Sequence, residues 1–300
     1  WIGMGVLGLM PLLTRFAPRS ITLPAAQDLR GMALAVDSNI FVHRFLKGTD
    51  GGSDEKRHLR GMQRLVTYAR KLDVLPLFVF DGKVPAQGKE LELEKRQAER
   101  LRVLQELDGE RARAQRIGSL AAISAQLDSE YAASATDEAR TVAWLESRTE
   151  ALPAADAQPA PTISGRLDRL EAAACRELLA MLGRLPDSGG AEGPALPMLQ
   201  ALSAERLAVL ARRTEPLTGS KIEECLELVT ALGCTAHVAD AGDESEAVCS
   251  QLCNAGVVDA VCSEDLDVVA HGARLLRGFG GLSSRSPMAL VDGRRAHEEL

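Results

Sequence analysis

The sequence predicts an α/β fold in which a parallel sheet is buried between helices. Short apolar runs lead into acidic residues along the chain, and segments with a helical pattern separate these runs. Apolar residues make up 46% of the 300 residues, which is enough for a sizeable hydrophobic core. Continuous apolar strands that alternate with helices are typical of parallel sheets covered on both faces.

The expected strands are rich in Leu, Val, Ala and Phe, and most end next to a carboxylate. They span residues 32–36 before Asp37, 75–80 before Asp81, 235–239 before Asp240 and 259–262 before Glu264, with 273–279 as a further strand. Helical patterns over 56–71, 220–232 and 244–255 precede the second, third and fourth strands. We expect Asp243 to act as the N-cap of the last of these helices.

The region from about residue 83 to residue 219 has a different character. It begins with a charged run rich in helix formers and contains two further helical segments, at 165–184 and 197–213. Two stretches rich in Pro and Gly, at 151–164 and 186–197, resemble linkers. The pattern predicts a long helical insertion between two halves of one α/β domain.

Charge and cysteine content narrow the class of protein. The net charge of −7 argues against binding of polyanions through bulk charge, although an acidic metal site is compatible with it. The six cysteines include no CxxC pair, so buried reduced thiols are favoured over a zinc site, and a reducing compartment is expected.

The first thirteen residues are almost wholly apolar, as in a signal peptide. They lack a basic segment and are too short to span a bilayer. We take Met4 as the natural start, which would make Gly5 the first residue after removal of Met. No membrane partner is expected, and no feature points to an oligomer.

Acidic residues follow several of the predicted strands, and ligands of open parallel sheets bind beyond the carboxyl ends of strands. Each Asp alone is better explained as a turn or cap residue, but the whole set predicts a metal site. Hard divalent cations relieve the repulsion between carboxylates, and two ions about 4 Å apart can activate water against a phosphodiester. The candidate ligands are Asp37, Asp81, Glu244, Glu246, Asp265 and Asp267.

These motifs carry a family resemblance. Met4-Gly-Val-Leu-Gly-Leu9, Ala-Val-Asp37-Ser and Phe78-Val-Phe-Asp81-Gly-Lys83 resemble the N-terminal block of the flap-endonuclease/XPG nucleases. Ala241-Gly-Asp-Glu244-Ser-Glu246-Ala and Ser263-Glu-Asp265-Leu-Asp267 resemble its internal block. The resemblance implies a PIN-like α/β fold and two-metal hydrolysis of DNA at a 5′ flap, branch or end. It also implies two Mg²⁺ ions, with Mn²⁺ as a substitute, and a role in DNA repair or replication in the nucleus.

The resemblance also assigns roles to single residues. It places metal ligation, direct or through water, on the six carboxylates, and it places Gly5 near the active site. Lys89, Lys95 and Arg96 fall where the family has basic residues that contact the scissile phosphate, while Lys83 and Arg100 would be further DNA contacts. His43 stands where relatives often carry a base-stacking aromatic, although a structural role is the plainer interpretation. The charged run is nearly balanced in sign, which by itself indicates a solvated helix.

The expected organisation has an N-terminal nuclease block at 1–107, a helical and linker insertion at 108–219, and an internal nuclease block at 220–300. This last block ends before the family's helix–turn–helix DNA clamp. The further Asp that normally precedes the clamp has no counterpart, because Asp292 lies in a different context.

Three alternatives remain at the level of sequence. Asp265-Leu-Asp267 after an apolar strand resembles the nucleophile motif of HAD-type phosphatases, but the later motifs of that family are not found. A non-catalytic, nuclease-derived interaction domain is the second alternative, but without bound metal the repulsion between its six carboxylates would only destabilise the fold. An RNA-directed PIN-type nuclease is the third alternative, because the sequence does not separate RNA from DNA.

Overall fold

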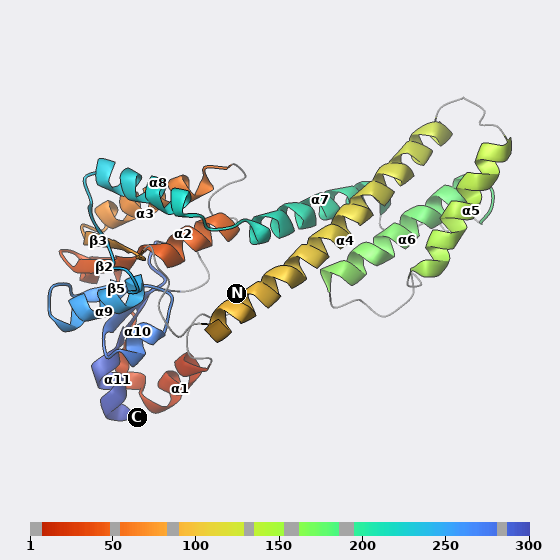
Figure 1. Ribbon diagram of the computed structural model, residues 1–300. Coiled ribbons are helices and arrows are strands. Elements are labelled where there is room, and N and C mark those ends of the chain that lie inside the picture. The colour runs from red at the N-terminus through yellow and green to blue at the C-terminus, as the bar shows by residue number, and fades with distance from the viewer. Residues whose placement is uncertain are drawn as a thin grey trace. The chain divides into compact units, whose positions relative to one another are not determined.

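The computed structural model describes residues 8–48, 55–82, 90–128, 135–152, 162–185, 195–280 and 287–300. The chain divides into two compact units, which are described separately (Figure 1). Unit 1 comprises Trp1–Arg96 and Glu215–Leu300, and unit 2 comprises Gln97–Thr214. Among the described helices none is both long and apolar enough to cross a membrane.

Unit 1 is built around a sheet whose described strands run in the order β1-β7-β6-β5-β2-β3-β4. The neighbours from β6 to β4 are parallel, while β7 and β1 form an antiparallel edge. The bounds are β1 Ile21–Thr22, β2 Ala33–Asp37, β3 Leu75–Phe80, β4 Thr235–Val238, β5 Ala260–Cys262, β6 Arg274–Arg277 and β7 Ala289–Asp292. In the register, Asp37 is opposite Val79 and Val36 is opposite Cys262, so the carboxyl ends of β5, β2 and β3 lie together.

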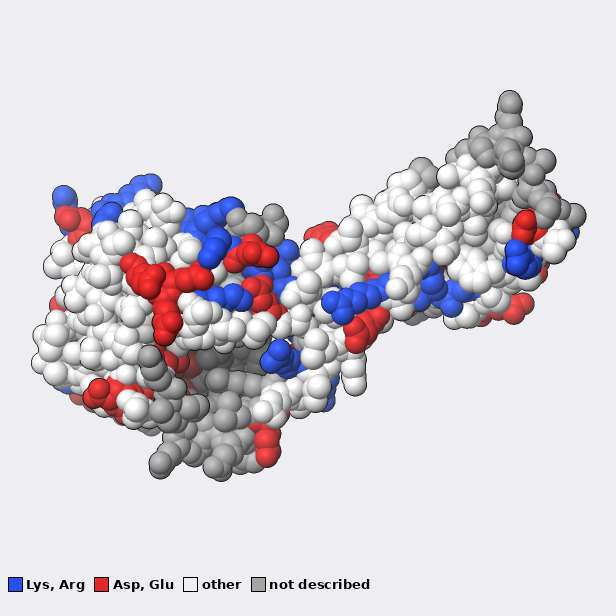
Figure 2. Space-filling model, turned by 45° about the horizontal axis from the view of Figure 1, so that its top comes forward, with Lys and Arg blue, Asp and Glu red and all other residues white. Residues whose placement is uncertain are grey.

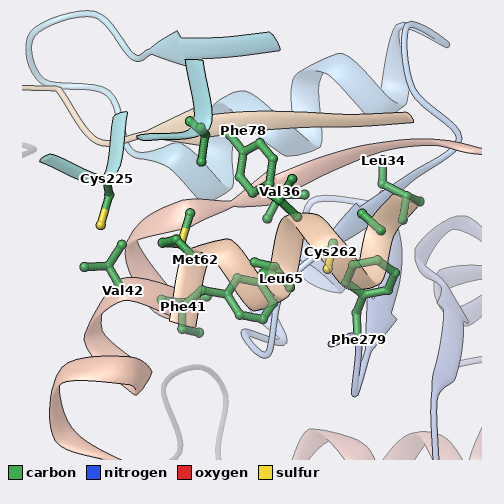
Figure 3. Packing of buried hydrophobic residues seen from close by; sticks show 14 of the residues in the cluster. Leu34, Val36, Phe41, Val42, Met62, Leu65, Phe78, Cys225, Cys262 and Phe279 are labelled. Carbon is green, nitrogen blue, oxygen red and sulfur yellow. The ribbon is translucent and has the colours of Figure 1, made fainter. Parts of the chain in front are cut away.

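Helices cover both faces of the sheet because successive strand residues point to opposite sides. On one face, Leu34, Val36 and Phe78 pack with residues of α2, α3 and α8 (Figure 3). On the other face, Ala35 and Val261 pack with residues of α1, α9, α10 and α11. The bounds are α1 Leu9–Phe16, α2 Ser38–Lys47, α3 Arg57–Lys71, α8 Gly219–Ala231, α9 Ser245–Asn254, α10 Asp267–Ala270 and α11 Gly293–Glu299, with short 3₁₀ turns at Pro18–Ser20 and Ala26–Leu29.

Unit 2 is helical and contains α4 Glu90–Asp128 from residue 97 onwards, α5 Ala135–Ala151, α6 Ile163–Met181 and α7 Ala195–Thr214. Its main apolar cluster joins the C-terminal part of α4 to α5, α6 and the start of α7. A smaller cluster forms where Val103 and Leu107 of α4 meet Leu210 of α7. The N-cap of α6 is Thr162, whose hydroxyl oxygen accepts a hydrogen bond from the Gly165 N–H at 3.2 Å.

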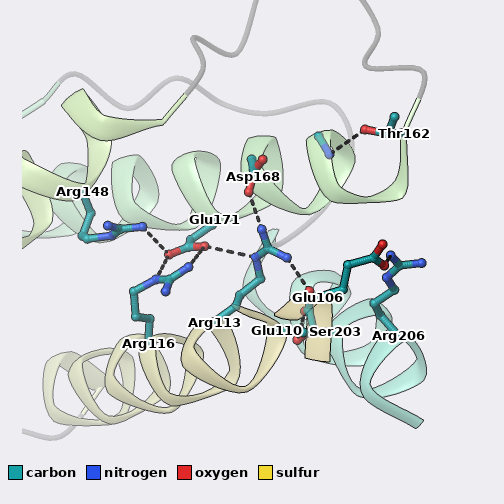
Figure 4. A network of polar contacts seen from close by, with 11 residues as sticks. Glu106, Glu110, Arg113, Arg116, Arg148, Thr162, Asp168, Glu171, Ser203 and Arg206 are labelled. Atoms are coloured by element: carbon teal, nitrogen blue, oxygen red, sulfur yellow. Dashed lines mark hydrogen bonds and ion pairs between the residues drawn. The ribbon is translucent and has the colours of Figure 1, made fainter. Parts of the chain in front are cut away.

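A charged network lies inside unit 2 (Figure 4). The carboxylate of Glu171 on α6 is only 1% exposed and receives hydrogen bonds from Arg116 at 2.6 and 3.0 Å and from Arg148 at 3.0 Å. Arg113 Nε lies 3.4 Å from the same carboxylate, and its guanidinium also pairs with the carboxylate of Glu110. The network therefore links α4, α5 and α6 through one buried anion.

The predicted α/β class, with a mostly parallel sheet and a helical insertion, is confirmed. The five expected strands are all present, whereas β1 and β7 were not predicted. The prediction that Asp243 caps the helix over 244–255 is wrong, because α9 begins at Ser245 with Glu244 at the N-cap position. The linker-like stretches lie largely outside the described residues, at 153–161 and 186–194.

All six cysteines are free thiols, and four of them are buried. Burial raises the pKa of the Cys175 thiol to about 11 and that of Cys225 to about 12. Burial likewise raises the pKa of Cys249 and of Cys262 far above the ordinary range. These four side chains therefore stay protonated near neutral pH and act as small apolar core residues.

Candidate active site

Four segments that are distant in sequence meet at the carboxyl ends of β2, β3 and β5. Asp37 is the last residue of β2, Asp81 follows β3 directly, and Ser263 and Asp265 follow β5. The N-terminus of α9 begins with Ser245 and approaches the same place, because its first residue contacts both Asp37 and Asp81. Strand order, and not sequence spacing, brings these groups together.

Asp37 is held from two sides. Its side chain is almost wholly buried and accepts hydrogen bonds from the hydroxyls of Ser245, at 2.7 Å to Oδ1, and Ser263, at 2.9 Å to Oδ2. Burial raises the pKa of this carboxyl to about 6, and the nearby charge of Asp81 adds to the effect, while the two serine hydroxyls oppose it. The ionised form is therefore costly in the absence of a nearby positive charge.

Asp81 is held by α9 and by Asn39. Its Oδ1 accepts the backbone N–H of Ser245 at 2.8 Å, which places the carboxylate at the N-terminus of a helix, where negative charge is favoured. Its Oδ2 accepts a hydrogen bond from the Asn39 amide, and its own N–H donates to Asn39 Oδ1 at 3.3 Å. This reciprocal pair fixes the orientation of Asp81 against the start of α2.

The segment after β5 continues the same chain of hydrogen bonds. The hydroxyl of Ser263, which donates to Asp37, accepts the N–H of Asp265 at 3.1 Å. Asp265 is buried, and its Oδ1 accepts the N–H of Asp267 at 3.0 Å at the start of α10. Asp37, Asp81 and Asp265 are thus joined through two serines, with Asp267 next along the chain.

The remaining acidic residues of the motifs take different positions. Glu244 and Glu246 are half-buried on either side of Ser245. Glu264 has other partners: its carboxylate accepts the N–H of Gly278 at 3.0 Å and lies 3.7 Å from the guanidinium of Arg44. The two glutamates that flank Ser245 therefore sit beside the hydrogen-bonded chain, whereas Glu264 ties the segment after β5 to β6 and α2.

The residues fit a hard divalent cation in donor chemistry, because the site offers carboxylate oxygens and a buried Asp37 that has two hydroxyl donors but no cationic side chain paired with it among the described residues. Within the described ranges, however, no three His, Cys, Asp or Glu side chains stand close enough together to hold a metal ion as they are. The assignment of the six carboxylates as metal ligands stays a prediction.

The predicted DNA contacts are placed only in part. Gly5, Lys83 and Lys89 lie outside the described residues, and Arg96 belongs to α4 but its side chain is not described. Lys95 and Arg100 are exposed on α4, and His43 is half-buried on α2. Their roles stay predictions.

Ser245, Ser263 and Asn39 were not singled out by the sequence, although they hold the aspartates. Each lies within two residues of a candidate ligand, so the motifs contained them. The sequence gives no indication of which carboxylate each of them contacts, because Ser245 donates to an aspartate 208 positions earlier in the chain.

Gly82 follows Asp81 at a place where only glycine fits. A Cβ there would lie 2.3 Å from the backbone oxygen of Asp240 and 3.0 Å from that of Ala239. Both neighbours are backbone atoms, so neither can move aside as a flexible side chain would. Gly82 therefore allows the ends of β3 and β4 to approach each other beside the site.

We expect Gly82→Ala to lower the free energy of unfolding by about 1–3 kcal/mol, because the added methyl overpacks the contact with the backbone. Urea unfolding followed by circular dichroism measures the change. Gly118→Ala is the matched control: it lies within α4, its Cβ would meet nothing within 4 Å, and it should stabilise the helix by up to about 1 kcal/mol. Equal stabilities for the two variants would contradict the proposed close approach.

Comparison with known proteins places the chain in a family. The XPG N-terminal domain matches residues 4–103 and the XPG I-region matches residues 236–290. Flap endonuclease 1-B of Oryza sativa subsp. indica is 25% identical over 308 residues, covering 99% of this chain and 53% of the rice protein. Flap endonuclease 1 of Cryptosporidium parvum is 32% identical over 125 residues, covering 38% of this chain and 24% of that protein.

Among solved structures, the catalytic core of Rad2 in complex with DNA substrate aligns with a TM-score of 0.47 and 15% identity, covering 98% of this chain and 57% of that one. The chain spans about half the length of the rice relative. The two matched regions coincide with the segments that supply Asp37 and Asp81 on one side and Ser245, Ser263 and Asp265 on the other. By these matches, the chain belongs to the XPG/flap-endonuclease family.

Proposed function

We propose that the protein is a metal-dependent, structure-specific nuclease that hydrolyses phosphodiester bonds of DNA at a 5′ flap, branch or end. The observation that carries the proposal is the hydrogen-bonded chain joining Asp37, Asp81 and Asp265 at the ends of adjacent parallel strands. Buried carboxylates are costly unless they are paired or bind metal, so a cluster of this kind indicates a cation site. The flap endonucleases named above agree with this proposal.

The site would take Mg²⁺, with Mn²⁺ as a substitute, and we propose two ions. Asp37, Asp81 and Asp265 would hold them directly or through water, together with Asp267, Glu244 and Glu246. When bound, such ions lower the pKa of a coordinated water and stabilise charge on the attacking and leaving oxygens.

The chain's own contribution is to hold the carboxylates in place beforehand. Asn39 and the N-terminus of α9 orient Asp81, and two serines orient Asp37. Partners of this kind, behind the ligands, fix their orientation so that little reorganisation remains when cation and substrate bind.

Contact with DNA would come from local basic residues. The net charge is −7, and on the face shown in Figure 2 acidic and basic side chains lie next to one another over unit 1. We propose that Lys83, Lys89 and Arg96, with Lys95 and Arg100 on α4, contact the phosphate backbone. Gly5 and His43 would lie against the substrate near the scissile bond. A nuclear location is part of the same proposal.

A cleavage panel tests the proposal. The 300-residue protein would be incubated with 5′-flap, bubble, nicked-duplex and single-stranded substrates, in DNA and in RNA, with Mg²⁺ and with EDTA. We expect cleavage of the branched DNA substrates that depends on Mg²⁺ and exceeds cleavage of the single strand. Faster cleavage of RNA would identify an RNA-directed nuclease instead, and no metal-dependent cleavage of any substrate would refute catalytic function.

A further inference from the structure

Ser245 is in contact with two aspartates that come from different strands. It is the first residue of α9 and its side chain is nearly inaccessible to solvent. Its hydroxyl donates to Asp37 Oδ1 at 2.7 Å, and its backbone N–H donates to Asp81 Oδ1 at 2.8 Å. One residue therefore sets the position of both carboxylates relative to α9.

This use of a serine differs from ordinary helix capping. An N-cap side chain normally accepts a hydrogen bond from a backbone N–H of the first turn. In α9 the N-cap is Glu244, which makes no such bond, and the Ser245 hydroxyl acts as a donor to a buried carboxylate. A hydrogen bond to an ionised acceptor is stronger and more directional than one between neutral groups.

Ser250 shows the alternative on the same helix. It is also buried, but its hydroxyl donates to the carbonyl oxygen of Glu246 at 2.8 Å, four residues earlier. That bond is local to α9 and contacts no aspartate. The two serines share burial and helix, and they differ in whether the hydroxyl reaches the site.

We infer that Ser245 is a positioning residue for divalent cation binding, which fixes Asp37 and Asp81 relative to each other before the cation arrives. The inference rests on the proposed function, because it deepens the role of the same site. Removal of the hydroxyl leaves the backbone bond to Asp81 in place and releases one oxygen of Asp37. Asp37 keeps its second donor, Ser263, so the fold of the site survives while the orientation of one carboxylate loosens.

The test measures cation binding without a substrate. Mn²⁺ would be titrated into the 300-residue protein, with binding followed by calorimetry, for wild type, Ser245→Ala, Ser245→Thr and Ser250→Ala. Loss of a hydrogen-bonding partner of a metal ligand typically weakens metal affinity by about 10–100-fold. We expect an increase of that size in the Kd for Ser245→Ala, substantial recovery in Ser245→Thr, which keeps a hydroxyl, and no change in Ser250→Ala.

A kinetic measurement separates positioning from general damage. In Ser245→Ala, the Mg²⁺ concentration that gives half-maximal cleavage should rise by a factor similar to that in Kd, while the rate at saturating Mg²⁺ returns towards the wild-type value. Melting temperatures of Ser245→Ala and Ser250→Ala measure any loss of structure that the two share.

An unchanged Mn²⁺ Kd in Ser245→Ala, or an equal loss in Ser250→Ala, overturns the inference. A wild-type protein that binds no Mn²⁺ overturns it as well. If wild type binds Mn²⁺ and only Ser245→Ala weakens binding, but no substrate is cut, the positioning role stands and the proposed nuclease activity is refuted. The two failures are therefore distinguishable.

Discussion

Replacement of Asp81 by Asn is expected to reduce Mg²⁺-dependent cleavage of a 5′-flap DNA by about a thousandfold. A cation that stabilises charge in phosphodiester hydrolysis contributes several kcal/mol, and each 1.36 kcal/mol of barrier corresponds to a factor of about ten in rate. Asn has nearly the same shape as Asp, but it lacks the negative charge that a cation needs. Single-turnover cleavage measures the rate at the chemical step.

The structure also predicts what this substitution does to the fold. One Asp81 oxygen accepts a hydrogen bond from the Ser245 N–H and the other accepts one from the Asn39 side-chain amide. In Asp81→Asn one of these oxygens becomes an NH₂ group, so two hydrogen-bond donors would face each other there. Such a mismatch costs about 1–3 kcal/mol, which lowers stability without unfolding a typical domain. Urea unfolding measures this cost, and circular dichroism shows that the variant is folded under assay conditions.

Asp240→Asn is the matched control for the loss of activity. Asp240 also follows a strand of the same sheet, and its backbone lies beside Gly82, but its side chain is exposed and is not part of the hydrogen-bonded chain that joins Asp37, Asp81 and Asp265. Its variant should cleave at the wild-type rate. Near-normal cleavage by Asp81→Asn, or an equal defect in Asp240→Asn, would show that the site has been assigned to the wrong carboxylates.

The second large effect concerns stability. We expect Glu171→Ala to lower the free energy of unfolding of unit 2 by about 3–5 kcal/mol, the usual cost of leaving one side of a buried ion pair without its partner. Arg113, Arg116 and Arg148 converge on this carboxylate, so its removal leaves three partly buried guanidinium groups close together. The loss should be evident as earlier unfolding in urea.

Tryptophan fluorescence can report on unit 2 separately. The chain has two tryptophans, Trp1 and Trp144, and Trp144 packs against the main apolar cluster of unit 2. In a Trp1→Phe background, the emission of Trp144 therefore follows unfolding of this unit. Asp108→Ala serves as the control, because the pair of Asp108 with Arg111 is exposed and worth only about 0–1 kcal/mol. A small effect of Glu171→Ala, similar to that of the control, would contradict the role of the buried network.

Acid pH should have a related effect through Glu171. Burial raises the pKa of Glu171, but the hydrogen bonds and charges of Arg116 and Arg148 lower it by more, so the pKa lies below its ordinary value. An acid with a lowered pKa contributes stability above its unfolded pKa of about 4.3 and loses it as the pH falls through the folded pKa. The stability gap between wild type and Glu171→Gln should therefore narrow as the pH falls below about 4.

Local patterns in the sequence specify the central strands and the family motifs. Apolar runs were sufficient to predict β2 to β6, and the runs of β2 to β5 also lead into carboxylates. Continuous apolar residues suit β2 and β5, which are buried on both faces, whereas β4 is largely exposed at the edge of the sheet. The helical insertion followed from helix-forming composition. Asp37, Asp81 and Asp265 could be placed near each other because parallel strands end at one edge of a sheet.

Other features exist only through tertiary contacts. β1 is two residues long and is a strand only because it pairs with β7, so no local pattern indicates it. The 39 residues of α4 have helix-forming composition, but which of them are buried, such as Val103, Leu107 and Leu120, depends on packing against α5, α6 and α7.

The partners of the buried polar groups could be decided only by the fold. Ser245 and Ser263 donate hydrogen bonds to Asp37, which lies more than 200 residues earlier in the chain. Glu171 pairs with arginines from two other helices, α4 and α5. Sequence spacing determines neighbours within a strand or helix, where the backbone geometry is periodic. Contacts between elements depend on strand order and helix packing, so the choice of serine donors for Asp37 and of arginines for Glu171 emerges only when those elements are assembled.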